Sequence, residues 1–468
     1  MFIKQLYTNC LSEAAYYIES NGEAAVVDPL RDIDTYLKLA AERKASIKYI
    51  FETHFHADFV SGHVDLSHAT GAAIVYGPGT KTSFQVHVAA DGETFSLGAL
   101  TIKALHTPGH TLESTCYLLN DESGNPHCLF SGDTLFVGDV GRPDLAQSKD
   151  LSVLDLAGML YDSLQQKIVP LADEVILYPA HGPGSACGKS LGPHTQSTIG
   201  AERATNYALK AATKEEFIKE VTEGLSEPPS YFPINAEINK KGYDSIDTIL
   251  QNGLTPLSVQ EVKEALAGNT ILLDTRPAVQ FTQGLVPGSI FIGLEGRFAE
   301  WAGSLLPFNQ PMILITEPGN ERETIVRLAR VGFSQVAGYL QGGFEAWVAA
   351  GEPIDLIIDV EADELAMDIP FDENLVVLDV RKPAEFADGH VKDARNIPLD
   401  ELIDPAAMAQ IEDEQNVYVH CAGGYRSVIA ASLLKRQGIH NLRNVVGGWA
   451  RIKEQENIET VKENSVLN

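Results

Sequence analysis

The sequence has few cysteines, few basic residues for its length and no long apolar run. Its 5 cysteines in 468 residues are odd in number and scattered, which argues against a disulfide framework and indicates a reducing compartment. No segment reaches the roughly 18 apolar residues of a membrane span. The first residues also lack the basic and apolar regions of a secretory signal. We therefore expect a cytoplasmic protein that does not enter a membrane.

Basic residues are outnumbered by acidic ones. The chain has 35 Lys and Arg against 64 Asp and Glu, a formal net charge of −29 at pH 7. This charge opposes binding to nucleic acid or to an anionic membrane, because both require basic surface. We expect neither as a partner, and an anionic substrate would need cations supplied by its own site.

The composition is otherwise that of a globular protein, with 44% hydrophobic and 21% charged residues. One hydrophobic core rarely serves more than a few hundred residues, so the length predicts two or three domains. In the first half the predicted strands are 14–18, 24–27, 48–52, 72–76, 100–105, 116–119, 128–131 and 174–179, and the predicted helices are 33–43 and 151–166. This mixture favours an α/β layered domain that ends near Gly224, followed by a linker or irregular tail at 227–233.

The second half contains an internal repeat. Asp274 and Arg276 recur 105 residues later as Asp379 and Arg381, and the glycine pair at 342–343 recurs at the same offset. A period this long indicates duplicated domains rather than a solenoid, whose repeats are roughly 20 to 50 residues. Strands and helices alternate in each copy, which predicts small α/β domains with parallel sheets. The predicted domains are 1–240, 255–353 and 358–462.

Polar side chains of metal-ligand type follow several predicted strands of the first half. They are His54, His56 and Asp58 in one short motif, then His110, Asp133 and His181, each beside a glycine. Residues two apart in an extended segment point the same way, so His54 and His56 are expected to converge. A lone histidine is usually structural. Four such sites after four strands instead indicate a metal centre, because histidine and aspartate are ligands of catalytic transition metals.

The order and spacing of these residues resemble the metallo-β-lactamase superfamily over roughly the first half of the chain. The resemblance implies an αββα fold, a β-sandwich between helices, with the metal held by loops at one edge. Phe59 departs from the superfamily motif, because many members have a histidine there that builds a second metal position with Asp58. An apolar ring removes that ligand, so a single metal is favoured over a dinuclear hydrolase site.

Within the superfamily, the persulfide dioxygenase family has motifs that resemble, in order, the segments 53–58, 107–111, 131–134 and 141–144. That resemblance implies one Fe(II) per chain, bound by His54, His110 and Asp133. The remaining three groups, which would orient ligands and bound water, are His56, Asp58 and His181. Two histidines and one carboxylate leave open positions for substrate and dioxygen, as in non-haem Fe(II) oxygenases. The implied reaction converts a low-molecular-weight thiol persulfide, dioxygen and water into a thiol and sulfite.

Two further residues of this half have open roles. Arg142 is expected either to offer a cation to the anionic persulfide or to form an ordinary salt bridge. Cys187 lies six residues after His181 in a glycine-rich loop. It is either a substrate contact or persulfide relay, which would require a depressed thiol pKa, or an inert small residue.

The last third of the chain carries a cysteine at a strand end. Residues 417–420 are a predicted strand and 428–435 a predicted helix, so Cys421 opens a loop at a helix N-terminus. Backbone N–H groups and the helix dipole stabilise a thiolate or persulfide there. The loop continues through Ala422, Gly423, Gly424, Tyr425, Arg426 and Ser427. The glycines let the backbone curl around the sulfur, and the arginine suits the oxygens of sulfite or thiosulfate.

This loop resembles the active-site loop of rhodaneses, and the upstream segments 378–381 and 389–391 resemble the motifs of the same family. A cysteine phosphatase would have five residues between Cys421 and Arg426 to cradle phosphate, whereas this chain has four. Sulfur transfer is therefore favoured over phosphate chemistry.

The first repeat provides an internal comparison. The position of Cys421 holds Thr316 in that copy, and the position of Arg426 holds Glu321. A threonine cannot carry a sulfane sulfur, and acidic residues repel anions. We expect this copy to be non-catalytic and to serve as a spacer or docking surface.

Together the motifs resemble the persulfide dioxygenase–rhodanese fusions of bacterial sulfide detoxification. We expect the first centre to make sulfite and a Cys421 persulfide to convert sulfite into thiosulfate, or the reverse, with the linkage raising the local concentration of the intermediate. Two alternatives stay open: a zinc-dependent thioester hydrolase similar to glyoxalase II with sulfurtransferase domains, and a non-enzymatic sulfur sensor or carrier. The carrier thiol (glutathione, coenzyme A, bacillithiol or cysteine) and a homo-oligomeric state are left open.

Overall fold

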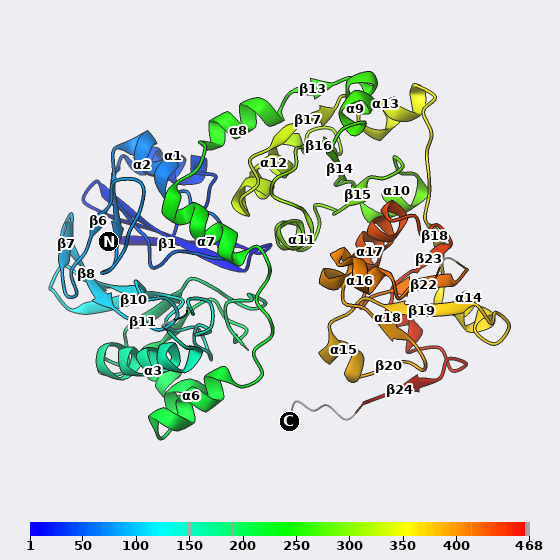
Figure 1. Ribbon diagram of the computed structural model, residues 1–468. Coiled ribbons are helices and arrows are strands. Elements are labelled where there is room, and N and C mark those ends of the chain that lie inside the picture. Colours follow the sequence, from blue (N-terminus) through cyan, green and yellow to red (C-terminus); the bar gives the residue numbers. More distant parts are fainter. Residues whose placement is uncertain (148, 150, 190, 413, 464–468) are drawn as a thin grey trace. The chain divides into compact units, whose positions relative to one another are not determined.

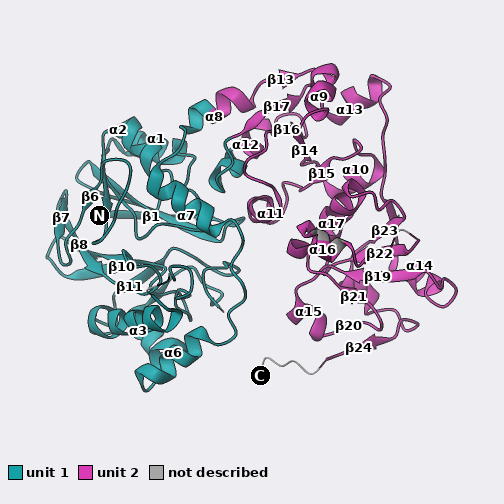
Figure 2. Cartoon of the chain, in the orientation of Figure 1, with its two compact units in different colours: residues 1–248, 326–334 teal, residues 249–325, 335–468 magenta. Residues whose placement is uncertain are grey.

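The computed structural model describes residues 1–147, 149, 151–189, 191–412 and 414–463. The chain divides into two compact units (Figures 1 and 2), of which the first comprises residues 1–248 and 326–334 and the second residues 249–325 and 335–468. Among the described residues, no helix combines the length and the apolar character needed to cross a membrane.

The first unit is built on two six-stranded sheets. One sheet has the order β1 (Phe2–Thr8), β2 (Glu13–Ser20), β3 (Glu23–Val27), β4 (Ser46–Phe51), β5 (Ala73–Tyr76) and β6 (His87–Val88). The other has the order β12 (Ser197–Thr198), β11 (Ile176–Pro179), β10 (Pro126–Gly132), β9 (Thr115–Asn120), β8 (Leu100–His106) and β7 (Thr94–Leu97). Loops that follow strands of both sheets carry the candidate metal ligands.

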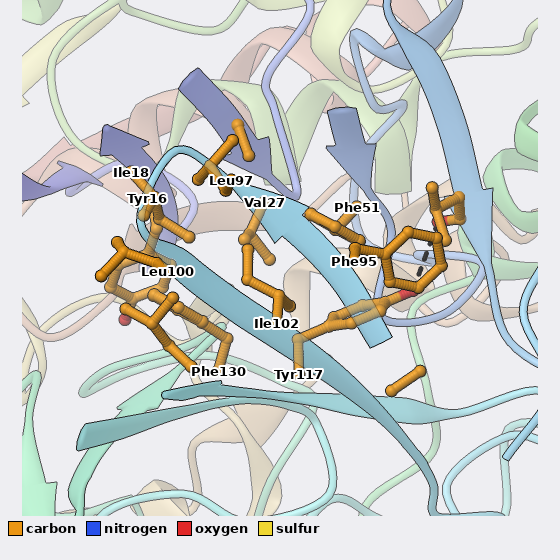
Figure 3. Close-up of a cluster of buried hydrophobic side chains, with 14 of the residues drawn as sticks. Tyr16, Ile18, Val27, Phe51, Phe95, Leu97, Leu100, Ile102, Tyr117 and Phe130 are labelled. Atoms are coloured by element: carbon orange, nitrogen blue, oxygen red, sulfur yellow. Dashed lines mark hydrogen bonds between the residues drawn. The ribbon is translucent and has the colours of Figure 1, made fainter. Parts of the chain in front are cut away.

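The two sheets pack face to face over an apolar core (Figure 3). Tyr16 and Phe130, from opposite sheets, have ring centroids 5.0 Å apart, and those of Phe51 and Tyr117 are 4.7 Å apart. Successive side chains of a strand point to opposite faces, so Tyr17 lies on the outer side of the first sheet. Both faces of that sheet are therefore buried.

Helices cover both outer faces. Tyr36 of α1 (Asp34–Arg43) and Leu66 of α2 (His63–Thr70) pack on the first sheet. Leu160 of α3 (Val153–Ser163) and Phe217 of α6 (Lys214–Thr222) pack on the second. The smaller helices of this unit are η1 (Leu164–Ile168), α4 (Ile199–Thr205) and α5 (Tyr207–Lys210). The αββα sandwich expected from the sequence is thus confirmed.

The expected irregular tail is only partly correct. Helix α7 (Phe232–Lys241) begins inside it, with Pro233 in the first turn, where its missing N–H costs no helical hydrogen bond. Asn239 of this helix donates hydrogen bonds to the carbonyl oxygens of His56 and Phe59, at 2.8 and 2.9 Å. Helix α7 therefore holds the metal-motif loop from outside the sandwich. Helix α8 (Ile246–Gly253) follows it.

The second unit contains two five-stranded parallel sheets with the same strand order. The first copy has the order β13 (Pro256–Leu257), β17 (Val336–Leu340), β16 (Met312–Ile315), β14 (Ile271–Asp274) and β15 (Ile290–Phe291). The second has the order β18 (Ile358–Val360), β23 (Leu442–Val445), β22 (Asn416–His420), β19 (Leu375–Asp379) and β21 (Arg395–Asn396). An antiparallel pair, β20 (His390–Val391) with β24 (Thr460–Val461), accompanies the second copy.

The helices of the first copy are α9 (Val259–Leu266), α10 (Ala278–Gln283), α11 (Phe298–Leu305), α12 (Glu321–Arg330) and α13 (Gly343–Ala349). Those of the second copy are α14 (Ala362–Asp368), α15 (Pro383–Ala387), η2 (Leu399–Ile403), α16 (Pro405–Met408), α17 (Tyr425–Arg436) and α18 (Trp449–Ile452). Figure 1 shows these helices alternating with the strands along the chain, so the predicted pair of parallel α/β domains is confirmed.

The repeated Asp-x-Arg motif makes the same structure in both copies. Arg276 forms hydrogen bonds to Asp274 at 2.7 Å and to the carbonyl oxygen of Gly284 at 2.8 Å. Arg381 contacts Asp379 at 2.9 Å and the equivalent carbonyl, Gly389, at 2.8 Å. Burying a carboxylate at a strand end is tolerated because the guanidinium satisfies its oxygens. The motif is therefore structural in both domains.

Candidate metal centre and sulfur-transfer loop

His54, His110 and Asp133 meet at one edge of the sandwich, each on a loop that follows a strand. Nε2 of His110 lies 3.4 Å from Oδ2 of Asp133, and Nε2 of His54 lies 3.8 Å from the same oxygen. All three side chains are buried, and their ligand atoms lie within 4.8 Å of one another. The structure therefore brings together the three residues predicted to bind iron.

The hydrogen bonds on the far side of each ring set the orientation of the two histidines. Nδ1 of His110 donates to the carbonyl oxygen of Arg142 at 2.8 Å. Nδ1 of His54 lies 2.9 Å from the hydroxyl oxygen of Thr53, which itself donates to Asp28 at 2.9 Å. Both Nδ1 atoms therefore carry the proton, and both Nε2 lone pairs face Asp133. This is the arrangement by which an outer carbonyl or hydroxyl fixes a metal-binding tautomer.

The carboxylate of Asp133 shows why a metal fits here. Both its oxygens are buried, and neither has a hydrogen-bond partner among the described residues. Lone pairs of two imidazoles directed at an unpaired carboxylate are unfavourable unless a cation lies between them. Burial, together with the neighbouring histidines, holds the pKa of His54 well below its usual value, which keeps the ring in the neutral form that binds metals.

The backbone behind these ligands requires glycine. A Cβ on Gly141 would lie 1.9 Å from the carbonyl oxygen of Asp133 and 3.0 Å from Nδ1 of His110. No side chain can occupy that position without displacing a ligand. Gly141 begins the segment 141–144, which resembles a motif of the persulfide dioxygenase family. Its role is steric, because the absence of a side chain lets the ligand loops approach one another.

His56 points away from the three ligands. Its Nε2 lies 3.0 Å from Asp28 and 3.6 Å from Glu52. Burial opposes the charged ring, but these carboxylates outweigh it and raise the pKa of His56 to about 10. Asp28 also accepts a hydrogen bond from the hydroxyl of Thr53, which contacts His54. His56 is therefore connected to His54 through Asp28 and Thr53 rather than through a shared metal.

Phe59 is fully buried and contributes no ligand atom. Its ring packs against that of His56, with centroids 4.3 Å apart. The backbone carbonyl oxygen of Phe59 accepts a hydrogen bond from the side chain of Asn239. The position that completes a second metal site in many superfamily members is thus filled by an apolar contact.

Asp58, His181 and Cys187 form a second buried group beside the first. Nε2 of His181 lies 3.4 Å from Oδ2 of Asp58 and 3.5 Å from Oδ1 of Asp133. Burial, with added repulsion from the two carboxylates, raises the pKa of the Cys187 thiol well above its usual value. The depressed pKa that a nucleophilic relay needs is therefore not found in the protein environment alone.

Arg142 is 3% exposed and is held by the protein. Its guanidinium makes two hydrogen bonds of 2.7 Å to Asp144 and contacts the carbonyl oxygens of Ala186 and Ser226. These bonds tie together the loops around the metal ligands. A role for its charge in substrate binding stays a prediction.

Three residues of this site were missed from the sequence: Asp28, Thr53 and Asn239. Asp28 and Thr53 had a local signal, since Asp28 directly follows β3 and Thr53 follows the end of β4 by two residues, at the edge where the ligands meet. Asn239 had none, because it reaches the loop from a helix 183 residues further along the chain.

Cys421 lies directly after β22 and is 2% exposed. The backbone N–H of Gly424 donates to its Sγ at 3.1 Å, and Ser427 Oγ lies 3.7 Å from the sulfur. A Cβ on Gly448 would lie 2.2 Å from the carbonyl oxygen of Cys421. Glycine at position 448 therefore allows the backbone there to contact the backbone of Cys421. The loop residues Ala422, Gly423 and Tyr425 complete the turn into α17. The sulfur is therefore placed at the helix N-terminus, where negative charge is stabilised.

Arg426 is paired with a carboxylate. Its guanidinium makes a two-point contact with Glu385, at 2.7 and 2.8 Å. Burial would raise the pKa of Glu385, but the hydrogen bond and charge of Arg426 lower it overall. The cation expected to meet sulfite or thiosulfate oxygens is thus partly neutralised by the protein.

Changing Glu385 to glutamine is expected to lower the KM for thiosulfate. The change removes a negative charge that competes for Arg426, and partly exposed ion pairs contribute about 0.2–1 kcal/mol, which corresponds to roughly 1.5- to 5-fold. Steady-state sulfurtransferase kinetics at several salt concentrations would measure it. Glu459→Gln, which removes an ion pair with Lys392 elsewhere in the domain, is the control. An unchanged KM in Glu385→Gln would show that Arg426 does not meet the substrate.

The first copy touches the loop that carries Cys421. The hydroxyl of Tyr425 donates to the carbonyl oxygen of Gly293 at 2.7 Å. Further along α17, Oγ of Ser432 accepts from the N–H of Phe291 at 3.0 Å, and Arg436 donates to Gly288 at 2.7 Å. Helix α17, which begins at the Cys421 loop, therefore packs against the first copy over most of its length.

Removing the hydroxyl in Tyr425→Phe is expected to lower kcat for sulfur transfer by about 2- to 10-fold, since one hydrogen bond contributes about 0.5–1.5 kcal/mol. The KM for thiosulfate should change little, because the hydroxyl positions the loop and leaves the sulfur-binding groups intact. Tyr418→Phe, whose hydroxyl contacts Asp368 instead, is the matched control. A change confined to thermal stability would contradict the positioning role.

In the first copy, Thr316 directly follows β16 and is buried. Its hydroxyl oxygen has no hydrogen-bond partner among the described residues. Glu321, at the position equivalent to Arg426, begins α12. The loop of this copy thus offers neither a thiol nor a cation at the two equivalent positions.

Comparison with known proteins agrees with this architecture. The metallo-β-lactamase superfamily model matches residues 8–181, and the rhodanese-like domain model matches residues 258–350 and 361–455. A probable hydroxyacylglutathione hydrolase of Schizosaccharomyces pombe is 30% identical over 204 residues, which cover 43% of this chain and 73% of the relative. A hydroxyacylglutathione hydrolase of Francisella tularensis subsp. novicida is 33% identical over 183 residues, or 39% of this chain and 68% of the relative.

Two solved structures are also similar. A metallo-beta-lactamase from Staphylococcus aureus subsp. aureus COL is 31% identical, with a TM-score of 0.64, and the match covers 73% of this chain and 98% of that one. ETHE1 from Myxococcus xanthus is 29% identical, with a TM-score of 0.43, over 51% of this chain and 100% of that one. The fold and the buried histidine and aspartate cluster define a metal-binding αββα protein with sulfurtransferase-type domains. The chain belongs to the metallo-β-lactamase superfamily and carries two rhodanese-like domains.

Proposed function

We propose that this enzyme is a persulfide dioxygenase coupled to a sulfurtransferase. The observation that carries the proposal is the ligand set, in which His54, His110 and Asp133 converge while His56 is held by Asp28. Two histidines and one carboxylate with open positions are the ligands of mononuclear non-haem iron oxygenases. One Fe(II) per chain is the proposed cofactor.

The proposed reaction takes R-S-SH, dioxygen and water to R-SH and sulfite, with release of two protons. Bound iron would supply the activation of dioxygen and a positive charge for the persulfide anion. The chain's own part is to hold His54 and His110 in the neutral tautomer that presents Nε2 to the metal position. His181 and Asp58, with Nε2 and Oδ2 3.4 Å apart, can hold a proton released in the reaction.

We propose that Cys421 carries the second activity. Its thiolate attacks the sulfane sulfur of thiosulfate, the S–S bond breaks, and sulfite leaves with the electron pair, so that a Cys421 persulfide remains. In the opposite direction, that persulfide passes its outer sulfur to sulfite and gives thiosulfate. The Gly424 N–H and the N-terminus of α17 stabilise the anionic sulfur in both directions. Sulfide detoxification would use both activities.

A zinc-dependent thioester hydrolase is the second candidate, favoured by the hydroxyacylglutathione hydrolases that share 30% and 33% identity with this chain. His56 faces Asp28 instead of the three ligands, and Phe59 offers no ligand atom. Both observations argue against a dinuclear hydrolase site. Metal analysis of the purified chain, combined with oxygen-electrode assays on persulfides of glutathione, coenzyme A, bacillithiol and cysteine, separates the two. Protein that contains only zinc and consumes no oxygen with any persulfide would overturn the dioxygenase proposal.

A further inference from the structure

Helix α18 begins on the backbone of the Cys421 loop. The N–H of Trp449 donates to the carbonyl oxygen of Cys421 at 2.6 Å, and the N–H of Ala450 donates to that of Ala422 at 3.1 Å. Arg451 is the next residue of this helix. A basic side chain therefore lies directly after the two residues that bind the backbone of the loop.

The side chain of Arg451 extends along this contact. A Cβ on Gly447 would lie 2.5 Å from Cγ of Arg451, so the arginine stem covers that glycine. A Cβ on Gly424 would lie 3.5 Å from the backbone nitrogen of Gly447. Gly424 is the residue whose N–H donates to Sγ of Cys421. Gly447 thus lies between the stem of Arg451 and the residue that binds the sulfur.

The guanidinium of Arg451 is only weakly engaged by the protein. Its side chain is 66% exposed, and it lies 3.3 Å from the carboxylate of Glu454, whose side chain is 58% exposed. Such exposed pairs are weak, because water screens both charges. Arg426, by contrast, is held by Glu385 through two hydrogen bonds of 2.7 and 2.8 Å. Of these two arginines, Arg451 can exchange its partner for a bound anion more easily.

The first copy has the same local geometry with the opposite charge. A Cβ on Gly342, the counterpart of Gly447, would lie 3.0 Å from Cβ of Ala346, which takes the position of Arg451. The comparison extends to four positions around the loop. The residues Ala422, Arg426, Ala450 and Arg451 of the second copy correspond to Glu317, Glu321, Glu345 and Ala346 of the first. Three glutamates in one copy are thus exchanged for two arginines in the other.

The carboxylate of Glu321 shows what the loop backbone binds in the first copy. Its Oε2 accepts a hydrogen bond from the N–H of Gly319 at 2.9 Å. Gly319 is the counterpart of Gly424, and the two have similar positive φ angles of +98° and +105°. The donor that meets the sulfur of Cys421 in the second copy is therefore taken by a side-chain carboxylate in the first. The backbone favours an anion in both copies, and the surrounding charges decide whether that anion belongs to the protein.

We propose that Arg451 is a specificity-determining residue, which binds the oxyanion end of thiosulfate or sulfite beside the Cys421 loop. Thiosulfate carries two negative charges, and Arg426 is partly neutralised by Glu385, so a second guanidinium would balance the ligand. The net charge of −29 makes such local cations necessary. This inference rests on the proposed sulfur transfer at Cys421 and names a residue that selects its substrates by charge.

Replacing Arg451 with alanine, the residue of the first copy, is expected to raise the KM for thiosulfate by about 2- to 5-fold, as loss of an exposed ion pair would. The kcat should change little, because the guanidinium binds the oxygens and not the S–S bond that breaks. The KM should also depend less on salt, since screening acts on the charge that the variant lacks. Lys392→Ala, which removes a basic residue paired with Glu459 elsewhere in the domain, is the control.

A second measurement on the full-length chain needs no turnover. Cys421 is alkylated with iodoacetate, an anion, or with iodoacetamide, its neutral analogue, and the product is quantified by peptide mass spectrometry. The ratio of the two rates reports the electrostatic potential at the sulfur. Arg451→Ala should lower this ratio by about 2- to 5-fold and leave the iodoacetamide rate unchanged. Adding Ala450→Glu, which recreates the pair found in the first copy, should lower the ratio further, whereas Arg451→Lys should keep most of it.

An unchanged ratio in Arg451→Ala would overturn the proposal. So would an equal fall in both alkylation rates, because that result would show a change in the loop rather than in its charge. A parent chain whose ratio depends on Arg451 but which transfers no sulfur would refute the sulfurtransferase proposal and leave the anion-binding role of Arg451 standing.

Discussion

Replacing His110 with alanine is expected to abolish iron binding and persulfide-dependent oxygen uptake while leaving sulfur transfer from thiosulfate to cyanide intact. His110 presents Nε2 to Asp133 at 3.4 Å, and its other nitrogen is fixed by the carbonyl oxygen of Arg142. Loss of this ligand should weaken iron binding by at least about 100-fold, since groups that only support ligands already change affinity by about 10- to 100-fold. Iron content and oxygen-electrode rates measure the effect.

The matched control is His68→Ala, a change at an exposed histidine on α2 that contacts neither group of ligands. It should retain iron, oxygen uptake and sulfur transfer. If His110→Ala kept its iron, the ligand assignment would be wrong. If it lost both activities with an unchanged circular-dichroism spectrum, the two centres would have to act as one.

The convergence of His54, His110 and Asp133 was predictable, because each residue follows a strand and strands of a sandwich end at common edges. Their assignment as iron ligands came from the resemblance to persulfide dioxygenases and stays a prediction. The direction of His56 was not predictable. Spacing placed it beside His54, and the ring centroids are indeed 4.2 Å apart, yet its Nε2 is drawn to Asp28. A two-residue spacing fixes the side of the chain on which a group lies, whereas the final rotation depends on a carboxylate from another strand.

The duplication was also predictable from the sequence, because Asp274 and Arg276 recur 105 residues later as Asp379 and Arg381. The repeat predicts that the two copies share a fold, but it does not predict how they pack against each other. The contact between Tyr425 and Gly293 joins residues 132 positions apart and involves a backbone carbonyl, which carries no side-chain signature. The contact between the first copy and α17 could therefore be seen only in the structure.

Replacing Cys421 with serine should abolish thiosulfate sulfurtransferase activity, by at least about 1,000-fold, because loss of a nucleophile removes the covalent intermediate. Serine matches cysteine in shape and keeps the loop, but its oxygen cannot hold a sulfane sulfur. Mass spectrometry of the intact chain after incubation with thiosulfate should show one added sulfur in the parent and none in Cys421→Ser. Cys10→Ser is the control and should retain the added sulfur.

The same variant also decides how the two centres are connected. Oxygen uptake with glutathione persulfide should be unchanged in Cys421→Ser, because Cys421 does not belong to the iron-ligand set. Oxygen uptake with thiosulfate plus glutathione should disappear, since the persulfide must then be made at Cys421 before it reaches the iron. Loss of uptake with both sulfur sources would contradict this order. In that case the Cys421 persulfide itself, rather than a small thiol persulfide, would be what the metal centre oxidises.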